Sequence, residues 1–310
     1  MLNGRVGRKQ YPLVNTSISA TNVVPSRWRP SENAIVTSLY TDAYAPAVAA
    51  LGHSLRRANT SARLIMLYLP SQISAQALCL AAASGFVPHP VSRIPPPHNG
   101  SSITWRFADQ YTKLSLWTLD DLPTPVRALV YLDADMLVMK NFDELFSLPY
   151  PFAAVPDVFL GRRGFTINFN AGMLFLRPDS NLFHEMVNTL PDARYPPALA
   201  EQAFLNQYFA SDALRLPYVY NGNLAIKNRS PKLWASMQRE MRVLHYTLVK
   251  PFISKNWQTV PLERMEDRVE EAARSKGGVF REEMEHWGRV WRETKTLYAQ
   301  RMDECRRHYS

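Results

Sequence analysis

Cysteines and long apolar runs are scarce in this sequence, and each absence excludes a class of protein. The 310 residues include only two cysteines, Cys79 and Cys305, which have no metal-ligand spacing and predict no disulfide framework. This usage favours a reducing compartment, so we expect a cytoplasmic protein, with an organelle as the alternative. No apolar run approaches the roughly 20 residues of a membrane span, and we expect no membrane partner.

Acidic residues are missing from the first 30 positions, which contain five cations: Arg5, Arg8, Lys9, Arg27 and Arg29. From residue 262 onward, 11 basic and 11 acidic side chains cancel within the formal net charge of +9. Nucleic-acid binding requires a basic stripe clustered on a folded face, so we expect no nucleic-acid partner. Residues 1–32 predict an irregular basic tail, with a transit peptide as the alternative.

Strand and helix patterns alternate after residue 32. Short apolar runs at 33–40, 62–69 and 128–132 indicate buried strands, and 43–58 and 74–84 have helical spacing. This alternation is typical of βαβ units and a parallel sheet, which places the chain in the α/β class. We expect one domain at 33–261 and a charged helical extension at 262–310, where apolar residues from Phe280 have helical spacing. Ser180 is the predicted N-cap of a helix at 180–190.

Two aspartates follow the strand "ALVYL" directly. Asp133 and Asp135 are two residues apart, so in an extended segment their side chains point to the same face and can bind one cation. The carboxyl ends of strands in an open α/β sheet are also where ligands bind. The alternative is a plain surface turn, in which aspartate is common.

His245 ends another short strand pattern, "RVLH". A lone histidine at such a place is more often structural, but two carboxylates and an imidazole together suit a borderline-hard ion such as Mn²⁺. Lys250 adds a cation that can bind a phosphate-bearing ligand, and Lys113 lies in an otherwise uncharged helical pattern. Each lysine has the alternative of a solvated surface residue.

Several further segments have ordinary structural explanations. Asn170, Ala171 and Gly172 open a predicted strand, where glycine marks either a close approach or simple packing. Glu201 starts a predicted helix, and the helix dipole alone explains an acid there.

Four segments in order resemble glycosyltransferase family 8, especially its glycogenin and galactinol synthase branch: "YLDADMLVMKNFDELF", "FNAGMLFLRPD", "EQAFLNQYF" and "HYTLVKPF". The opening "IVTSLYTDAYAPAVAALGHSL" and "YTKLSLW" are similar to that family as well. The resemblance covers about residues 33–252. It implies the GT-A fold: a Rossmann-like, mostly parallel central sheet with helices on both faces and a small accessory sheet.

The resemblance also implies a donor site for a UDP-sugar. Asp133, Asp135 and His245 would bind Mn²⁺, with Mg²⁺ as a substitute, and Lys250 would steady the leaving diphosphate. Thr37, Ser38 and Tyr40 would hold the uridine, a set assigned by resemblance alone.

The remaining residues implied by the resemblance lie near the sugar. Lys113 and Asn170 would touch the sugar or the phosphate, and Ala134 and Ala171 would line the donor site. Glu201 and Gln202 would lie near the anomeric carbon, as nucleophile or as stabiliser of positive charge.

The sequence departs from the family at this last loop. The glycogenin branch has D-G-G-D-Q, whereas this chain has "ALAEQ" at 198–202, which leaves the acceptor and the sugar preference open. No tyrosine stands where glycogenin glucosylates itself, so self-glucosylation is disfavoured. The sequence neither requires nor excludes a homodimer.

The sequence therefore predicts a Mn²⁺-dependent retaining transferase that moves a hexose from a UDP-sugar to a hydroxyl of a carbohydrate, polyol or protein, in α-linkage. One alternative is a transferase-like domain that binds a nucleotide sugar or a partner without catalysis. The other is a haloacid dehalogenase-type phosphatase, in which the first aspartate of D-x-D is the nucleophile.

Overall fold

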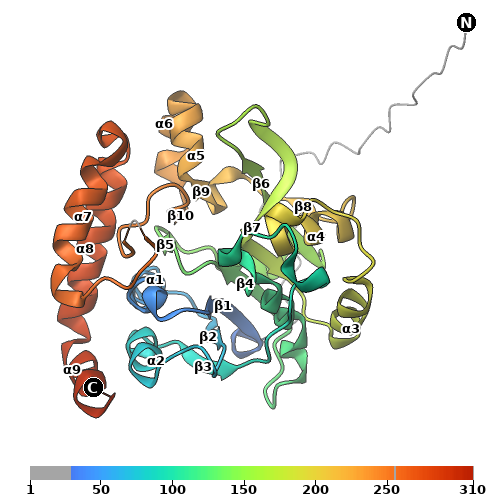
Figure 1. Ribbon diagram of the computed structural model, residues 1–310, viewed down its shortest axis with the longest axis horizontal. Coiled ribbons are helices and arrows are strands. Elements are labelled where there is room, and N and C mark those ends of the chain that lie inside the picture. The colour runs from blue at the N-terminus through green and yellow to red at the C-terminus, as the bar shows by residue number, and fades with distance from the viewer. Residues whose placement is uncertain (1–28, 255, 310) are drawn as a thin grey trace, which may run out of the picture.

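The computed structural model describes residues 29–254 and 256–309 (Figure 1). The predicted basic tail lies almost wholly outside the described residues. A short 3-10 turn at Pro30–Glu32 precedes the first strand.

A seven-stranded sheet forms the centre of the described chain, in the order β3-β2-β1-β4-β7-β6-β8. Its first four strands are parallel, β7 runs antiparallel to both β4 and β6, and β8 is parallel to β6. The predicted α/β class and the mostly parallel sheet are thus confirmed. The strands are β1 (Asn33–Leu39), β2 (Arg63–Tyr68), β3 (Val87–Pro90), β4 (Ala128–Leu132), β6 (Phe152–Val158), β7 (Phe165–Leu176) and β8 (Leu214–Arg215).

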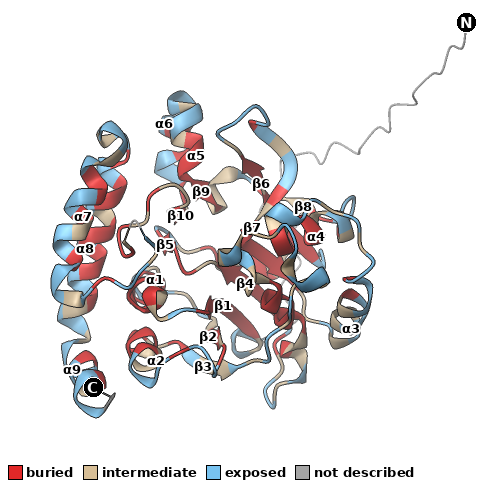
Figure 2. Cartoon of the chain, in the orientation of Figure 1, coloured by how far each residue is buried: buried red, intermediate tan, exposed pale blue. Residues whose placement is uncertain are grey.

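The apolar runs of the central strands are explained by burial on both sheet faces. Within β1, Ile35 belongs to one core cluster and Val36 to the cluster on the opposite face, because successive side chains alternate across a strand. Figure 2 shows the red, buried strands between layers of helices that are exposed on their outer sides.

Helices cover both faces of the sheet. The first face packs against α1 (Ala45–Arg57) and α2 (Ala75–Ala82). The second face packs against the 3-10 helix η6 (Gln110–Asp121), α3 (Ser180–Thr189) and α4 (Ala200–Tyr208). The predicted N-cap of α3 is wrong by one residue: the side chain of Asp179 caps the helix by accepting from the backbone of Asn181 and Leu182.

A small second sheet joins the carboxyl end of β4. It consists of β5 (Met136–Val138), β10 (Val243–His245) and β9 (Gly222–Asn223), with β10 antiparallel to β5. Two short helices, α5 (Leu224–Arg229) and α6 (Pro231–Met237), follow β9. This is the accessory sheet that the GT-A fold implied.

The C-terminal segment forms three helices along the outer side of α1 and α2 (Figure 1). They are α7 (Met265–Arg274), α8 (Arg281–Leu297) and α9 (Ala299–Tyr309). Buried tryptophans on α8, Trp287 and Trp291, join the same core cluster as α1, so the extension packs as part of this core.

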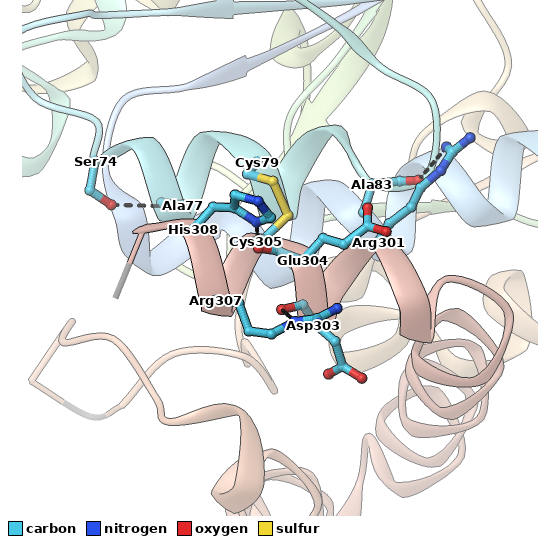
Figure 3. Close-up of a disulfide and its surroundings, with 10 residues drawn as sticks. All are labelled: Ser74, Ala77, Cys79, Ala83, Arg301, Asp303, Glu304, Cys305, Arg307 and His308. Carbon is cyan, nitrogen blue, oxygen red and sulfur yellow. Dashed lines mark hydrogen bonds between the residues drawn. A yellow bond between two sulfur atoms is a disulfide. The ribbon is translucent and has the colours of Figure 1, made fainter.

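The expectation that the two cysteines form no disulfide is wrong. Cys79 on α2 and Cys305 on α9 are bonded, with their Cα atoms 5.6 Å apart (Figure 3). The two cysteines are 226 residues apart in the chain, so no local spacing could indicate the pair. Disulfides persist in oxidising environments, so this bond removes the basis on which cysteine usage favoured a reducing compartment. Within the described residues, no helix is both long and apolar enough to cross a membrane.

Candidate functional site

The two aspartates lie where the chain passes from the large sheet to the small one. Asp133 follows the last residue of β4, and Asp135 precedes the first residue of β5. The antiparallel register places His245 opposite Met136, and the backbone N–H of Tyr246 donates to the carbonyl of Asp135 at 2.9 Å. The side chain of His245 is thereby brought to the aspartates from more than 100 residues away.

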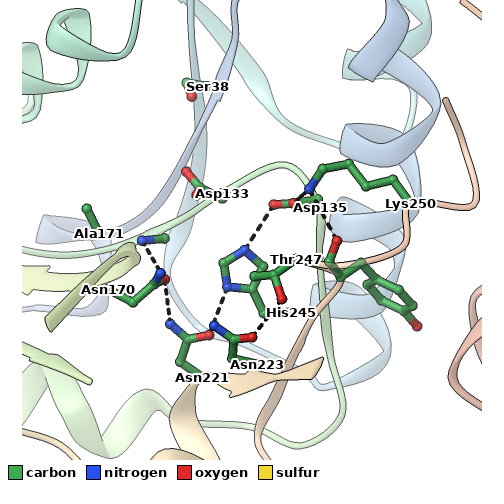
Figure 4. A network of polar contacts seen from close by, with 12 residues as sticks. Ser38, Asp133, Asp135, Asn170, Ala171, Asn221, Asn223, His245, Thr247 and Lys250 are labelled. Carbon is green, nitrogen blue, oxygen red and sulfur yellow. Dashed lines mark hydrogen bonds and ion pairs between the residues drawn. The ribbon is translucent and has the colours of Figure 1, made fainter. Parts of the chain in front are cut away.

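Asp133, Asp135 and His245 each offer a ligand atom, and these atoms lie within 4.8 Å of one another. Figure 4 shows the three side chains converging, with Lys250 on the far side of Asp135. The His245 Nε2 atom lies 3.3 Å from Asp135 Oδ1, and the Lys250 ammonium contacts Asp135 Oδ2. The predicted cluster is therefore assembled in the structure.

The orientation of the His245 ring follows from a chain of hydrogen bonds. The backbone N–H of Gly172 donates to Asn170 Oδ1, which also accepts from Asn221 Nδ2. Asn221 Oδ1 must then be the acceptor that lies 2.9 Å from His245 Nδ1, so Nδ1 carries a proton. A neutral ring directs the lone pair of Nε2 toward the aspartates, as a metal ligand requires.

These residues fit a divalent cation. Two carboxylates and an imidazole lone pair, which repel one another when nothing lies between them, are a donor set for such an ion. Gly172 closes the other side: a Cβ there would lie 2.5 Å from His245 Cε1 and 2.9 Å from Asp133 Oδ2. The site therefore requires glycine at this position.

Lys250 determines the charge of Asp135. Burial opposes ionisation of this carboxyl, but neighbouring positive charge, chiefly the Lys250 ammonium, more than offsets it and holds its pKa well below the usual value. The pKa of Lys250 is raised, because Asp135 outweighs the burial of the ammonium. Both groups are thus charged at neutral pH.

A second buried ion pair lies beside the first. The Lys113 ammonium donates to Glu201 Oε1 at 2.8 Å and to the carbonyl of Ala171 at 3.1 Å, and it lies 3.2 Å from Asp133 Oδ1. Although burial acts against the charge of Lys113, its two carboxylate partners raise its pKa. Burial raises the pKa of Glu201 despite the neighbouring ammonium. The alternative of a solvated surface residue is therefore wrong for Lys113, which is buried among carboxylates.

Gln202 is held in one orientation by its neighbours. Its Oε1 accepts from the backbone N–H of Ala171 at 3.0 Å, and its Nε2 donates to Asp157 Oδ2 at 2.8 Å. Asn170 Nδ2 donates to the other oxygen of Asp157 at 3.2 Å. Asp157 therefore fixes both predicted amides, and burial raises the pKa of its carboxyl above the usual value.

The predicted uridine residues lie at the end of β1. Ser38 Oγ is 2.8 Å from the Tyr131 hydroxyl, which donates to Asp133 Oδ1 at 2.8 Å. A chain of two hydrogen bonds therefore joins Ser38 to the first of the two aspartates. Thr37 is wholly buried, and Tyr40 is buried beside it.

Sequence reasoning missed three residues of this site: Tyr131, Asp157 and Asn221. Asp157 was detectable as a lone carboxylate inside the apolar run of β6. The sequence at Asn221, which precedes Gly222, indicates only a turn. Ala134, predicted beside the donor, is buried between the two aspartates.

Comparisons with known proteins bear on the same residues. A model of glycosyl transferase family 8 matches residues 106–259, which include most of the predicted site residues. The chain is similar to glycosyl transferase family 8 over this segment, which is just under half of its length. It is 29% identical over 233 residues to a glycogenin of Neurospora crassa, a match that covers 74% of this chain but only 32% of that protein. Galactinol synthase 2 of Arabidopsis thaliana is 28% identical over 289 residues, covering 83% of this chain and 82% of the synthase.

Solved structures support the fold. The bifunctional glycosyltransferase WbbM aligns with 83% of this chain and 52% of its own, with a TM-score of 0.53 and 17% identity. The glycosyltransferase GlyE of Streptococcus pneumoniae aligns with 86% of this chain and 64% of its own, with a TM-score of 0.51 and 17% identity. Both neighbours are glycosyltransferases by name, and at this identity they support the fold alone.

Proposed function

We propose that the protein is a Mn²⁺-dependent retaining glycosyltransferase that moves a hexose from a UDP-sugar to a hydroxyl acceptor, forming an α-linkage. The observation that carries this proposal is the cluster of Asp133, Asp135 and His245, with Lys250 and Lys113 on either side. Two carboxylates, an imidazole and two ammonium groups match what a bound cation and a diphosphate require together.

Asp133, Asp135 and His245 would hold the cation, with Mg²⁺ as a substitute for Mn²⁺. When bound, the ion would neutralise the negative charge that builds on the diphosphate as it leaves. Lys250 supplies a second positive charge at the same place, and burial strengthens its effect because the local dielectric is low. No proton transfer to the diphosphate is needed for this stabilisation.

Lys113, Glu201 and Gln202 would lie at the sugar. In the overall reaction an acceptor oxygen forms a bond to the anomeric carbon while the bond from that carbon to the β-phosphate oxygen breaks. The bonding electrons leave with UDP, and the acceptor proton passes to the released diphosphate. Glu201 carries the charge that could stabilise a cationic anomeric carbon or attack it, and Lys113 holds that carboxylate in place.

Asn170, Ala171, Ala134, Thr37, Ser38 and Tyr40 complete the proposed donor site. Asn170 and Ala171 are fixed against Gln202, and Ser38 is tied through Tyr131 to Asp133. The uridine would bind at the end of β1, so the nucleotide and the sugar occupy opposite sides of the aspartate loop.

Donor turnover tests the proposal. UDP-glucose, UDP-galactose and UDP-N-acetylglucosamine are incubated with the protein and Mn²⁺, Mg²⁺ or a chelator, and release of UDP is measured with and without acceptors. We expect Mn²⁺-dependent release from at least one donor, lost with the chelator. His245→Ala should reduce metal-dependent UDP affinity and turnover by at least about 100-fold, since it removes a ligand.

The control is His184→Ala, which removes an exposed histidine on α3 and should change neither quantity. Equal Mn²⁺-dependent UDP affinity in the His245→Ala variant would overturn the three-ligand site. If UDP binds but no donor is turned over with any acceptor, the protein is a binding domain and not an enzyme.

A further inference from the structure

The hairpin between β6 and β7 projects from the central sheet. Figure 1 shows its light-green turn at the upper edge of the view, past the ends of the neighbouring strands, and Figure 2 shows that most of it is exposed. The backbone N–H of Phe159 donates to the carbonyl of Gly164 at 2.9 Å, so the chain reverses direction over residues 159–164. We call residues 159–167, which include this turn and the start of β7, the hairpin tip.

The hairpin tip exposes three large apolar side chains: 44% of Leu160, 42% of Phe165 and 76% of Ile167 are accessible to solvent. Phe165 and Ile167 lie on the same face of β7 as Phe169, because side chains alternate along a strand. Phe169 is wholly buried in the core cluster of that face, so the core ends between Phe169 and Ile167. Single exposed apolar residues are ordinary, but a group of them at a projecting tip marks a surface that binds something.

Two arginines from neighbouring elements hold the hairpin tip in one conformation. Arg229, at the end of α5, donates from Nη1 to the carbonyls of Leu160 at 3.0 Å and Gly161 at 3.1 Å. Arg215, in β8, donates from Nε to the carbonyl of Ile167 at 2.7 Å. The exposed side chains are therefore presented by a fixed backbone, which lowers the entropy lost on binding.

The charge of this surface is of one sign. Arg162 and Arg163 are exposed in the turn. The hairpin tip and the elements that contact it belong to residues 158–178 and 213–239, and neither stretch contains an acidic residue. None of the ion pairs among the described residues involves these two arginines or the two that hold the hairpin backbone. The surface therefore suits a binding partner with negative charge.

A lipid bilayer fits this surface better than a protein does. Two hairpin tips facing each other in a dimer would bring arginines of the same charge together, which disfavours a second copy of the chain. A stable protein interface takes about 20–30 residues on each side, far more than the hairpin tip contains. A bilayer with anionic lipids requires no matching shape, since basic side chains bind its phosphates and apolar side chains enter its interface.

We propose that the hairpin tip binds the surface of a lipid bilayer that contains anionic phospholipids. Arg162 and Arg163 would contact the lipid phosphates, and Ile167 would enter the boundary between headgroups and acyl chains. Asn170 of the proposed donor site follows Ile167 by three residues, or roughly 10 Å of extended strand, so the donor site would lie close to that surface. The expectation of no membrane partner rested on the absence of a spanning segment, and a contact at the surface requires none. The inference goes beyond the proposed transferase function and does not depend on it.

Vesicle binding tests the inference without any donor or acceptor. The whole chain is mixed with vesicles of phosphatidylcholine alone, or of equal parts phosphatidylcholine and phosphatidylserine, and the bound fraction is measured by flotation. We expect binding only to the vesicles with phosphatidylserine, and weaker binding as salt screens the arginines. Ile167→Glu should lower the affinity at least about tenfold, the size of one buried apolar side chain. Arg162→Gln combined with Arg163→Gln should lower it about 25-fold, at about fivefold for each arginine.

Matched controls exist at the other end of the molecule. Leu297→Glu changes a leucine that is 68% exposed at the end of α8, and Arg306→Gln combined with Arg307→Gln removes two exposed arginines from α9. Figure 1 shows α9 at the lower left, away from the hairpin. These controls change the net charge by the same amounts as the hairpin variants, and we expect them to retain vesicle affinity within twofold. Circular dichroism and the unfolding midpoint check that every variant is folded.

Several outcomes would overturn the inference. One is no binding to the phosphatidylserine vesicles, and another is an equal loss in the hairpin variants and their controls. Equally tight binding to a soluble polyglutamate peptide that requires the arginines but not Ile167 would point to an acidic protein instead. A dimer in light scattering that Ile167→Glu dissociates would show that a second copy covers the surface. Donor hydrolysis is measured separately, so the proposed function and this inference can each fail alone.

Discussion

The candidate metal-ligand cluster (Asp133, Asp135 and His245) and the C-terminal helices use charged residues in different ways. Both nevertheless involve one segment of the chain. The cluster is built from buried and half-buried polar side chains at the ends of β4 and β10, inside the region that matches the family model. Helices α7 to α9 lie beyond residue 259, outside that match, and their outer faces have exposed ion pairs such as Arg274–Glu270. The charged groups of the first region lie at the proposed catalytic site, whereas those of the second are exposed to solvent on a helix surface.

The meeting point is the segment from His245 to Ile253. From α7, Arg268 Nε donates to the carbonyl of Ile253 at 2.7 Å and its Nη2 to the carbonyl of Lys250 at 3.3 Å. From α8, the backbone carbonyl of Glu283 accepts from the Tyr246 hydroxyl at 3.0 Å. The strand ends thus supply the polar groups of the site, while helices outside the matched region hold one side of it.

Asp135→Asn tests the first region and should have the largest effect. The change removes one negative charge between His245 and Lys250, so we expect metal-dependent donor turnover to fall by at least about 1,000-fold. Steady-state kcat/KM for the donor measures it. Asp192→Asn, at an exposed aspartate, should retain wild-type turnover. Retention of more than a tenth of the activity in Asp135→Asn would contradict a metal role for this carboxylate.

Cys305→Ser tests α9, the last of the C-terminal helices. Loss of the bond to Cys79 opens a covalent loop of 226 residues and should lower the free energy of unfolding by about 2–5 kcal/mol. Denaturant unfolding of the variant, and of the wild type with and without reductant, measures it. The donor KM should stay within twofold, because the contacts to the His245–Ile253 segment come from α7 and α8. A large rise in donor KM would make α9 part of the support as well.

Arg268→Gln tests the contact between α7 and the His245–Ile253 segment. The two carbonyls it contacts belong to the segment that carries Lys250, so we expect the donor KM to rise about tenfold, the size of one charged hydrogen bond, with a smaller change in kcat. Arg268→Lys should recover part of the loss. Arg274→Gln, on the same helix but exposed, is the control. Equal effects of Arg268→Gln and Arg274→Gln would show that α7 contributes general stability only.

The sequence predicted those parts of the site that local patterns encode. The strand ends at Asp133 and His245 were visible because apolar runs stop there. Asp157 and Asn221 were not recognised, since their role depends on contacts to Gln202 and Asn170 that lie 45 and 51 residues away. The contacts from Arg268 to the His245–Ile253 segment could not be predicted either. No local sequence pattern distinguishes a solvated arginine from one that donates to a backbone carbonyl.

Ala200→Gly should have the smallest effect, and it tests strain beside the site. Ala200 is buried with φ of 48° and ψ of −132°, a conformation that favours glycine, and the glycogenin branch has glycine at this place in D-G-G-D-Q. Relief of the strain, less the entropy that glycine loses on folding, should raise the free energy of unfolding by about 1 kcal/mol. Ala203→Gly, in the interior of α4, should instead lower it by about 1 kcal/mol. If both changes destabilise the protein equally, Ala200 is unstrained. If Ala200→Gly stabilises the protein but slows sugar transfer, the strained backbone is what directs Glu201 toward the sugar.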